Sequence, residues 1–281
     1  MRGLEEFSRT ALMVAAMRAR ASVGPDALCD DPWADALAGS DGHAVAATFD
    51  RIQPPTEMWV ALRTAWIDER LATLAGTRTG RGQVVILGAG LDARAARLAR
   101  QGLRFFEVDH PGTQAAKLER VGAVQGYPVD AATYVSCDFE TDDFLDRLVG
   151  AGFDPGSPAF ITWEGVTPYL PEEAVRATLT RIAQGCHERT VLTFDFINKN
   201  MAQGLGLTAD DAEVRATVDD LGEPFRFGTN DILPLLADCG FLHVRTTSFD
   251  EICLSATGTY ERSRKFRFQH MALVSRAEDL S

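Results

Sequence analysis

The chain has 281 residues, of which 46% are hydrophobic and 24% charged, and its formal net charge at pH 7 is -12. This balance is typical of a globular protein, and the length suits one large α/β domain. The acidic charge disfavours a nucleic-acid partner, because an acidic surface repels the phosphate backbone.

The spacing of the cysteines and histidines argues against a disulfide framework and against a metal site. The five cysteines are scattered without CxxC spacing, which favours free thiols in a reducing cytoplasm over a disulfide framework. The five histidines show neither HxH nor HxxxH spacing, so we expect no metal site.

No apolar run approaches the length of a membrane span, and the N-terminus lacks the long apolar core of a signal peptide. We expect a cytoplasmic protein with a small-molecule partner and leave its oligomeric state open.

The first 80 residues predict helices and no strand. Helical patterns cover residues 8–20, with Ser8 as a plausible N-cap, then 31–39 and the strongly periodic stretch 57–76. We interpret residues 1–80 as a helical cap and residues 81–281 as an α/β core with an inserted helix at about 205–225. Together they are expected to form a single domain over residues 1–281.

From Val84 onward, strand patterns alternate with helix patterns, which predicts right-handed βαβ crossovers and a mostly parallel sheet. The expected strands are 84–87, 104–108, 133–137, 159–163, 190–196, 241–247 and about 268–274. The expected helices of this part are 92–100, 113–121, 142–148, 171–184, 208–221 and 230–239.

Polar or glycine residues follow the first four strands, at the sheet edge where open α/β sheets bind their ligands. They are Gly88 and Gly90, then Asp109, then Asp138 with Phe139, and finally Glu164. Asp109 lies nineteen residues beyond Gly90, and a carboxylate there can accept hydrogen bonds from both hydroxyls of an adenosine ribose. NAD and S-adenosylmethionine share that adenosine, so this signal alone leaves both open.

Two features favour S-adenosylmethionine, although GAGLDA also fits the GxGxxA dinucleotide fingerprint. Asp92 sits in the first turn of the following helix, where it would repel a pyrophosphate. The carboxylates of Asp138 and Glu164 suit an amine or a sulfonium better than a dianion. No tyrosine has a lysine four residues later, so the Tyr-x-x-x-Lys pair of a hydride-transfer enzyme is absent from the sequence.

The segments GAGLDAR, FFEVDHP, CDF and WEGVTPYLPEEA resemble the leucine carboxyl methyltransferase family. The resemblance includes the bacterial branch of S-adenosylmethionine-dependent O-methyltransferases, some of which act in polyketide biosynthesis. It runs from about Ser8 to Phe241, whereas residues 248–267 match nothing in the family. It implies a class I methyltransferase fold, which is Rossmann-like and has seven strands, the last of them antiparallel, with an N-terminal helical cap.

By motif position, the resemblance also implies a set of cofactor-binding residues: Arg63, Gly88, Gly90, Asp109, Asp138, Phe139 and Glu164. The glycines would approach the amino-acid part of S-adenosylmethionine, and Asp109 would bind the ribose. Asp138 and the backbone of Phe139 would hold the adenine. Glu164 would bind the amine of the methionine moiety, and Arg63 its carboxylate.

Two further residues are expected at the reacting centre. Tyr169 matches the tyrosine of the family's YLP motif, which faces that centre, and Arg18 is the expected basic residue of the cap, with Arg20 nearly as good a match. The apolar residues Met13, Met17, Trp33, Trp59 and Trp66 either line a pocket for a hydrophobic acid or pack the cap on the core.

The scarcity of acid and base groups favours a carboxylate as methyl acceptor. A carboxylate is ionised at pH 7 and needs no base, whereas a phenol, with a pKa of about 10, usually calls for a base or a metal. His110 is the one histidine beside the expected site, and we expect it to pack on Pro111 or face solvent. We predict methyl-ester formation on a small-molecule carboxylate of the secondary-metabolite kind. Hydroxyl methylation, an NAD-linked oxidoreductase, a protein substrate and a non-catalytic S-adenosylmethionine-binding protein remain alternatives.

Overall fold

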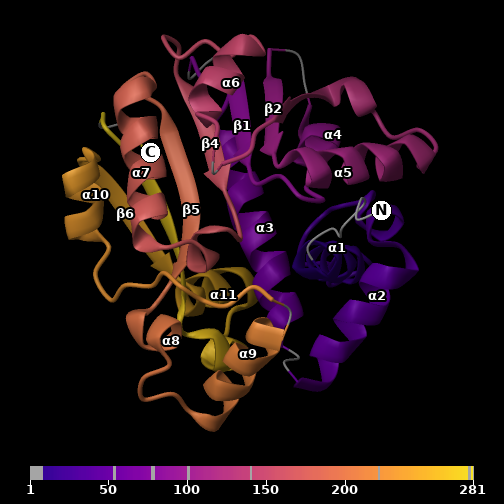
Figure 1. Cartoon of the computed structure of the whole chain (residues 1–281). Coiled ribbons are helices and arrows are strands. Elements are labelled where there is room, and N and C mark those ends of the chain that lie inside the picture. Colours follow the sequence, from indigo (N-terminus) through magenta and orange to yellow (C-terminus); the bar gives the residue numbers. More distant parts are fainter. Residues whose placement is uncertain are drawn as a thin grey trace.

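A seven-stranded sheet forms the centre of the computed structural model, which describes residues 9–52, 55–76, 80–99, 102–139, 141–220, 222–277 and 280 (Figure 1). The strand order is β3-β2-β1-β4-β5-β7-β6, and β7 runs antiparallel to both of its neighbours, β5 and β6. The strands are β1 Gln83–Leu87, β2 Arg104–Asp109, β3 Ala132–Ser136, β4 Ala159–Trp163, β5 Val191–Ile197, β6 His243–Ser248 and β7 Gln269–Ser275. Each of the seven predicted strands is present, shifted by at most two residues at either end, so the predicted fold class is confirmed.

Alternation along the strands sends apolar side chains into two cores, one on each face of the sheet. Val84 and Ile86 of β1 face one core, and Val85 and Leu87 face the other. Helices α3 Pro55–Leu74 and α11 Phe249–Thr257 cover the first face, and α6 Phe144–Gly150, α7 Glu172–Gly185 and α10 Leu233–Cys239 cover the second. Burial on both faces explains why β1, β4 and β5 read as nearly continuous apolar runs.

The remaining helices lie near the N-terminus or follow the strands β1, β2 and β5 in the chain. Helices α1 Arg9–Ala21 and α2 Ala34–Ile52 pack on one another and lie next to α5 in Figure 1. The others are α4 Arg94–Leu98, α5 Pro111–Ala123, α8 Lys199–Gln203 and α9 Ala209–Asp220. Among the described helices, none combines the length and apolar character needed to cross a membrane.

The helix expected over residues 31–39 is longer in the structure. Ser8, the expected N-cap of the first helix, lies outside the described residues. Helix α2 begins at Ala34, kinks at Gly39 and continues to Ile52. Gly39 has a φ of 60° and a ψ of -174°, a conformation that glycine adopts at little cost. Glycine often ends a helix, but Gly39 only bends α2.

The segment between β6 and β7, which matched no family pattern, folds into a helix followed by a 3-10 turn. A capping box between Ser248 and Glu251 starts α11, and Gly258 in the left-handed conformation ends it. The 3-10 helix η4 spans Glu261–Phe266. Phe249 packs edge-on against Trp59 of α3, with ring centroids 5.0 Å apart, so this segment is fixed to the helical cap.

One buried ion pair joins β2 to α5. Lys117 of α5 pairs with Glu107 of β2, and both side chains are 2% exposed. The Lys117 ammonium also donates to the backbone oxygen of Asp92 at 2.5 Å. Burial raises the pKa of Glu107 to about 6, and the neighbouring ammonium limits that rise.

Breaking this pair on one side should destabilise the fold more than removing both partners. We expect Lys117→Met to lower the unfolding free energy by about 3–5 kcal/mol at pH 7, because Glu107 is left buried without a cation. The double variant Glu107→Gln/Lys117→Met should stay within about 1–2 kcal/mol of the parent. Urea unfolding measures both, and Arg147→Met at the exposed pair with Asp142 is the control.

The same pair sets a pH dependence with a defined sign. The pKa of Glu107 is raised in the folded state from 4.5 to about 6, so its contribution to stability is full below about pH 4.5 and falls as pH rises to about 6. Glu107→Gln should flatten the unfolding free energy across that window. An unchanged slope in the variant would contradict the assignment.

Candidate functional site

A cavity of about 430 Å³ opens where β1, β2 and β4 end, within the size range of small-molecule pockets. The loops that follow these strands form one wall, α1 and α3 form a second, and the chain after Leu207 forms the third. All but one of the predicted site residues line this cavity: Arg18, Arg63, Gly88, Gly90, Asp109, Phe139, Glu164 and Tyr169. The exception is Asp138.

The glycines after β1 let the chain turn within close reach of two other segments. Gly88 has a φ of +68°, and a Cβ there would lie 2.6 Å from Val166 Cγ2. Gly90 has a φ of +46°, and a Cβ there would make an ordinary 3.5 Å contact with Ala11 Cβ. Gly88 is therefore required both by its backbone conformation and by the loop after β4, whereas Gly90 is required by conformation alone.

Asp109 anchors the turn from the end of β2. Its Oδ2 accepts a hydrogen bond from Gly90 N at 2.6 Å, and its Oδ1 accepts one from His110 N at 2.7 Å. Burial raises the pKa of Asp109, and the two backbone N–H groups oppose the rise. Each oxygen keeps a free lone pair for a further donor. His110 is exposed and caps α5 by accepting from Gly112 N, in line with its expected position outside the site.

Of the two residues predicted to bind adenine after β3, Phe139 lines the cavity and Asp138 does not. Phe139 is 45% exposed. The backbone N–H of Asp138 donates to Asp142 Oδ2 at 3.0 Å, and its carbonyl accepts from Asp142 N at 2.7 Å. The adenine assignment of both residues stays a prediction.

Glu164, after β4, is held between two guanidinium groups. Arg63 Nε donates to Oε1 at 2.8 Å, and Arg94 Nη1 donates to Oε2 at 2.6 Å. Burial alone would raise the pKa of Glu164, but Arg94 and Arg63 outweigh it and lower the pKa. Arg63 also pairs with Asp195 of β5 at 2.8 Å. Sequence reasoning missed Asp195, because it lies inside the buried apolar strand Val191–Ile197.

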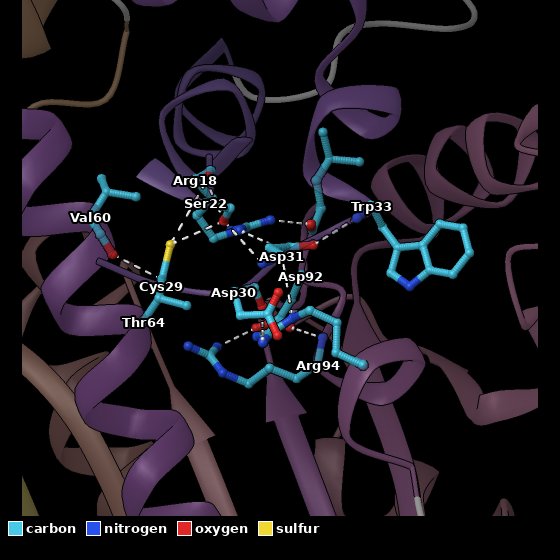
Figure 2. Close-up of polar contacts among 12 residues, drawn as sticks. Arg18, Ser22, Cys29, Asp30, Asp31, Trp33, Val60, Thr64, Asp92 and Arg94 are labelled. Atoms are coloured by element: carbon cyan, nitrogen blue, oxygen red, sulfur yellow. Dashed lines mark hydrogen bonds and ion pairs between the residues drawn. The ribbon is translucent and has the colours of Figure 1, made fainter. Parts of the chain in front are cut away.

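Together with Arg63, Arg94 and Glu164, two further carboxylates, those of Asp92 and Asp68, form one charged cluster. Figure 2 shows the part of this cluster around Asp92 and Arg94. Asp92 Oδ1 accepts from Arg94 N at 2.6 Å, and its other oxygen pairs with the Arg94 side chain. Burial alone would raise the pKa of Asp92, but the cations Arg94, Arg18 and Lys117 together outweigh it and lower the pKa to about 2. Asp68 of α3 completes the cluster by pairing with Arg94 at 2.7 Å and with Arg97 at 2.8 Å.

Arg18 ties α1 to this cluster, as Figure 2 shows. Its Nε donates to Asp31 Oδ2 at 2.9 Å, and its Nη2 donates to the carbonyl of Leu91 at 2.5 Å. Arg20, the alternative basic residue, instead pairs with Asp50 and Glu57 at half-exposed positions and is not among the lining residues. The structure thus brings Arg18 to the cavity, where the contact with Leu91 joins the cap to the turn after β1 and the contact with Asp31 lies within the cap.

Tyr169, in the 3-10 helix η3 Thr167–Tyr169, lines the cavity near Arg63 and Asp195, whose charges act on its hydroxyl. Its ring stacks on Phe225, with centroids 5.6 Å apart and planes 21° from parallel. Burial raises the pKa of its hydroxyl further above the usual range. Tyr169 is therefore a protonated hydrogen-bond donor at neutral pH and a poor base.

The apolar residues of the cap separate into two groups. Met13 and Trp59 line the cavity, whereas Met17 is packed in the core of the cap and Trp33 lies edge-on against Tyr127. Lining residues that sequence reasoning missed include Thr56, Phe49, Asp195, Glu223, Phe225, Phe266, Phe268 and Gln269. A pattern that marks part of this set is the repeated Phe-Arg-Phe, at 225–227 and at 266–268.

Arg94 should be the residue on which the charged cluster depends most. Arg94→Gln leaves Asp92, Asp68 and Glu164 each short of a cation, so we expect the unfolding free energy to fall by about 3–5 kcal/mol. Arg176→Gln, at an exposed pair with Asp238 on α10, should cost less than about 1 kcal/mol. Urea unfolding of both variants checks this, and equal losses would contradict it.

Comparison with known sequences identifies the family. The model of the leucine carboxyl methyltransferase family matches residues 11–183. A relative from Parafrankia sp. (strain EAN1pec), named as a candidate S-adenosyl-L-methionine-dependent methyltransferase, is 37% identical over 191 residues. That match covers 65% of this chain and 61% of the relative, so the chain spans about three fifths of the length of this curated relative.

Solved structures with the same fold match along nearly the whole chain. One is a candidate methyltransferase from Thermobifida fusca YX, with a TM-score of 0.66 at 17% identity, covering 98% of this chain and 97% of that one. Another is a DUF574 family protein from Streptomyces avermitilis MA-4680, with a TM-score of 0.65 at 15% identity, covering 94% and 97%. At these identities the likeness concerns the fold, which is that of class I methyltransferases. The chain belongs to the leucine carboxyl methyltransferase family.

Proposed function

We propose that this protein transfers a methyl group from S-adenosylmethionine to a carboxylate oxygen of a small molecule and so forms a methyl ester. The observation that carries the proposal is the content of one cavity: the glycine turn after β1, the Asp109 carboxylate and the Glu164–Arg63 pair. The family to which the chain belongs supports the same activity.

The groups in the cavity fit the cofactor by their chemistry. The lone pairs left on Asp109 suit the two hydroxyls of a ribose. Glu164 suits an ammonium, and the guanidinium of Arg63 suits a carboxylate. Phe139 offers an exposed ring for an adenine. A pyrophosphate fits less well, since Asp92 already accepts the backbone N–H of Arg94 at the start of α4.

The residues near Tyr169 favour an acceptor that is already ionised. When bound, S-adenosylmethionine supplies a methyl carbon that bonds to the acceptor oxygen while the carbon–sulfur electron pair stays on sulfur. Tyr169 can donate a hydrogen bond to a carboxylate and so orient it. Among the described residues, no histidine lines the cavity. The chain's part is alignment and exclusion of water, which need no base.

Hydroxyl methylation is a second possibility, and Glu223 is the observation that favours it. This carboxylate lines the cavity, and its charge contributes to raising the pKa of Tyr169. A carboxylate beside the reacting centre can accept a proton from an alcohol as the new bond forms.

Ligand binding tests the cofactor assignment first. In calorimetric titrations, S-adenosylmethionine and S-adenosylhomocysteine should bind one to one, and NAD should give no signal. Asp109→Asn should weaken S-adenosylhomocysteine by about a hundredfold or more, because two hydrogen bonds to a charged acceptor are weakened. Asp130→Asn, an exposed acid near the same strand, is the matched control. Retention of full affinity in Asp109→Asn would refute the assignment.

The pH profile separates the two acceptors. For a carboxylic acid, turnover should be flat between about pH 6 and 9, because the acceptor is ionised throughout. Glu223→Gln should leave that rate within about twofold. A rate that rises with pH, as a phenol with a pKa of about 10 ionises, would instead identify a hydroxyl acceptor. A drop of about a hundredfold in Glu223→Gln would identify Glu223 as the base.

A further inference from the structure

The half of the cavity away from the charged cluster is lined mainly by apolar side chains. Trp59, Phe225, Phe266 and Phe268 supply aromatic rings, and α9 adds Val214 and Val218. Ring contacts join these parts into one wall: Trp59 packs on Phe249, Phe249 on Phe266 and Phe266 on Phe268, with centroids 5.0, 6.5 and 5.2 Å apart. The segment between β6 and β7, which fits no family pattern, therefore builds part of this wall.

A buried amide interrupts the apolar half. Gln269, the first residue of β7, is 8% exposed and lines the cavity, and its Oε1 has no hydrogen-bond partner. Its side chain lies on the sheet face covered by α3, because Met271 and Leu273, two and four residues on, pack into the core there. A buried amide oxygen without a partner is costly to fold, and native proteins satisfy most such atoms.

Thr56 of α3 is a second buried polar residue of the cavity without a hydrogen-bond partner. It is 7% exposed, and its Oγ1 is the atom that lacks a partner. Thr56, Trp59, Val60 and Arg63 recur at helical spacing, so they form one stripe of α3 along the cavity. Thr56 lies seven residues from Arg63, which is about 10 Å along the helix axis.

The position of Gln269 relative to the charged cluster follows from the register of the sheet. Asp195, which pairs with Arg63, is opposite Met271, and Ile197 is opposite Gln269. Gln269 therefore lies two residues beyond the level of Asp195, about 7 Å further toward the carboxyl end of β5. Both unpartnered groups are thus set back from Glu164 and Arg63, where a cofactor would be held.

We propose that Gln269, assisted by Thr56, binds a neutral polar group on the far end of the methyl acceptor, which is an aromatic or alicyclic acid with a hydroxyl or carbonyl group remote from its carboxylate. The inference rests on the proposed function and names the substrate class of the same site. An amide and a hydroxyl each donate and accept, so they suit an uncharged hydroxyl or carbonyl. The aromatic wall suits the flat apolar body between the two ends.

Two matched pairs of acids test the inference: 2-naphthoic acid with 6-hydroxy-2-naphthoic acid, and biphenyl-4-carboxylic acid with its 4′-hydroxy derivative. Formation of S-adenosylhomocysteine gives kcat/KM for each acid. We expect the protein to prefer the hydroxylated member of at least one pair by about tenfold, the factor one good hydrogen bond provides. Gln269→Met, which keeps the length and removes the amide, should abolish the preference, and Thr56→Val should reduce it.

Gln114→Met is the matched control, because Gln114 also has a buried, unpartnered amide atom but does not line the cavity. It should keep the preference for the hydroxylated acid. Gln269→Met should also raise the Tm of the ligand-free protein by about 2 °C, since an unpaired buried acceptor is replaced by an apolar group of similar shape. A merely structural glutamine would show a lower Tm in the variant and no change in preference.

Each other outcome refutes one part of the proposal. An absent preference, or one that survives in Gln269→Met, refutes the role of Gln269. Binding of S-adenosylhomocysteine without turnover of any of the four acids refutes the substrate class and leaves the cofactor assignment intact. Absence of S-adenosylmethionine and S-adenosylhomocysteine binding refutes the proposed function itself.

Discussion

The ion pairs that Glu164 makes with Arg63 and Arg94 fix the relative positions of three separate parts of the chain. Arg63 comes from α3, Arg94 from α4 and Glu164 from the loop after β4. Side chains this deeply buried must be paired, because an unpaired charge in a low-dielectric interior is costly. The helical cap, the glycine turn and the strand ends are therefore held to one arrangement, and Asp195, Asp92 and Asp68 complete the pairing.

That cluster also divides the cavity into two chemically different halves. The half near Asp109 and Glu164 is lined by carboxylate and guanidinium groups. The other half is built of aromatic rings from α3, the loop before α10, and the segment before β7. Tyr169 lies between them, with its hydroxyl kept protonated by burial. A methyl donor with charged ends and an acceptor with an apolar body fit this division, and the unpartnered oxygens of Gln269 and Thr56 lie among the aromatic rings.

Sequence patterns predicted the sheet well, for a physical reason. Strands buried on both faces read as short apolar runs such as Val84–Leu87, and glycines or acids follow them where the chain leaves the sheet. Patterns failed where local signals were weak or ambiguous. Helix α8 has only five residues, α11 is marked by little beyond its Ser248–Glu251 capping box, and Gly39 bends a helix that it was expected to end.

The sequence by itself determined the strand ends, and through them the cluster of Gly88, Gly90, Asp109, Phe139 and Glu164, because parallel strands bring their carboxyl ends to one edge. Only the tertiary structure decided which of these groups reach the cavity and what else does. Asp138 stays outside its lining, Arg18 takes precedence over Arg20, and Gln269 enters from a strand 105 residues beyond Glu164 in the chain. Contacts between segments so distant depend on packing and on the pairing of buried charges, which no local pattern of residues records.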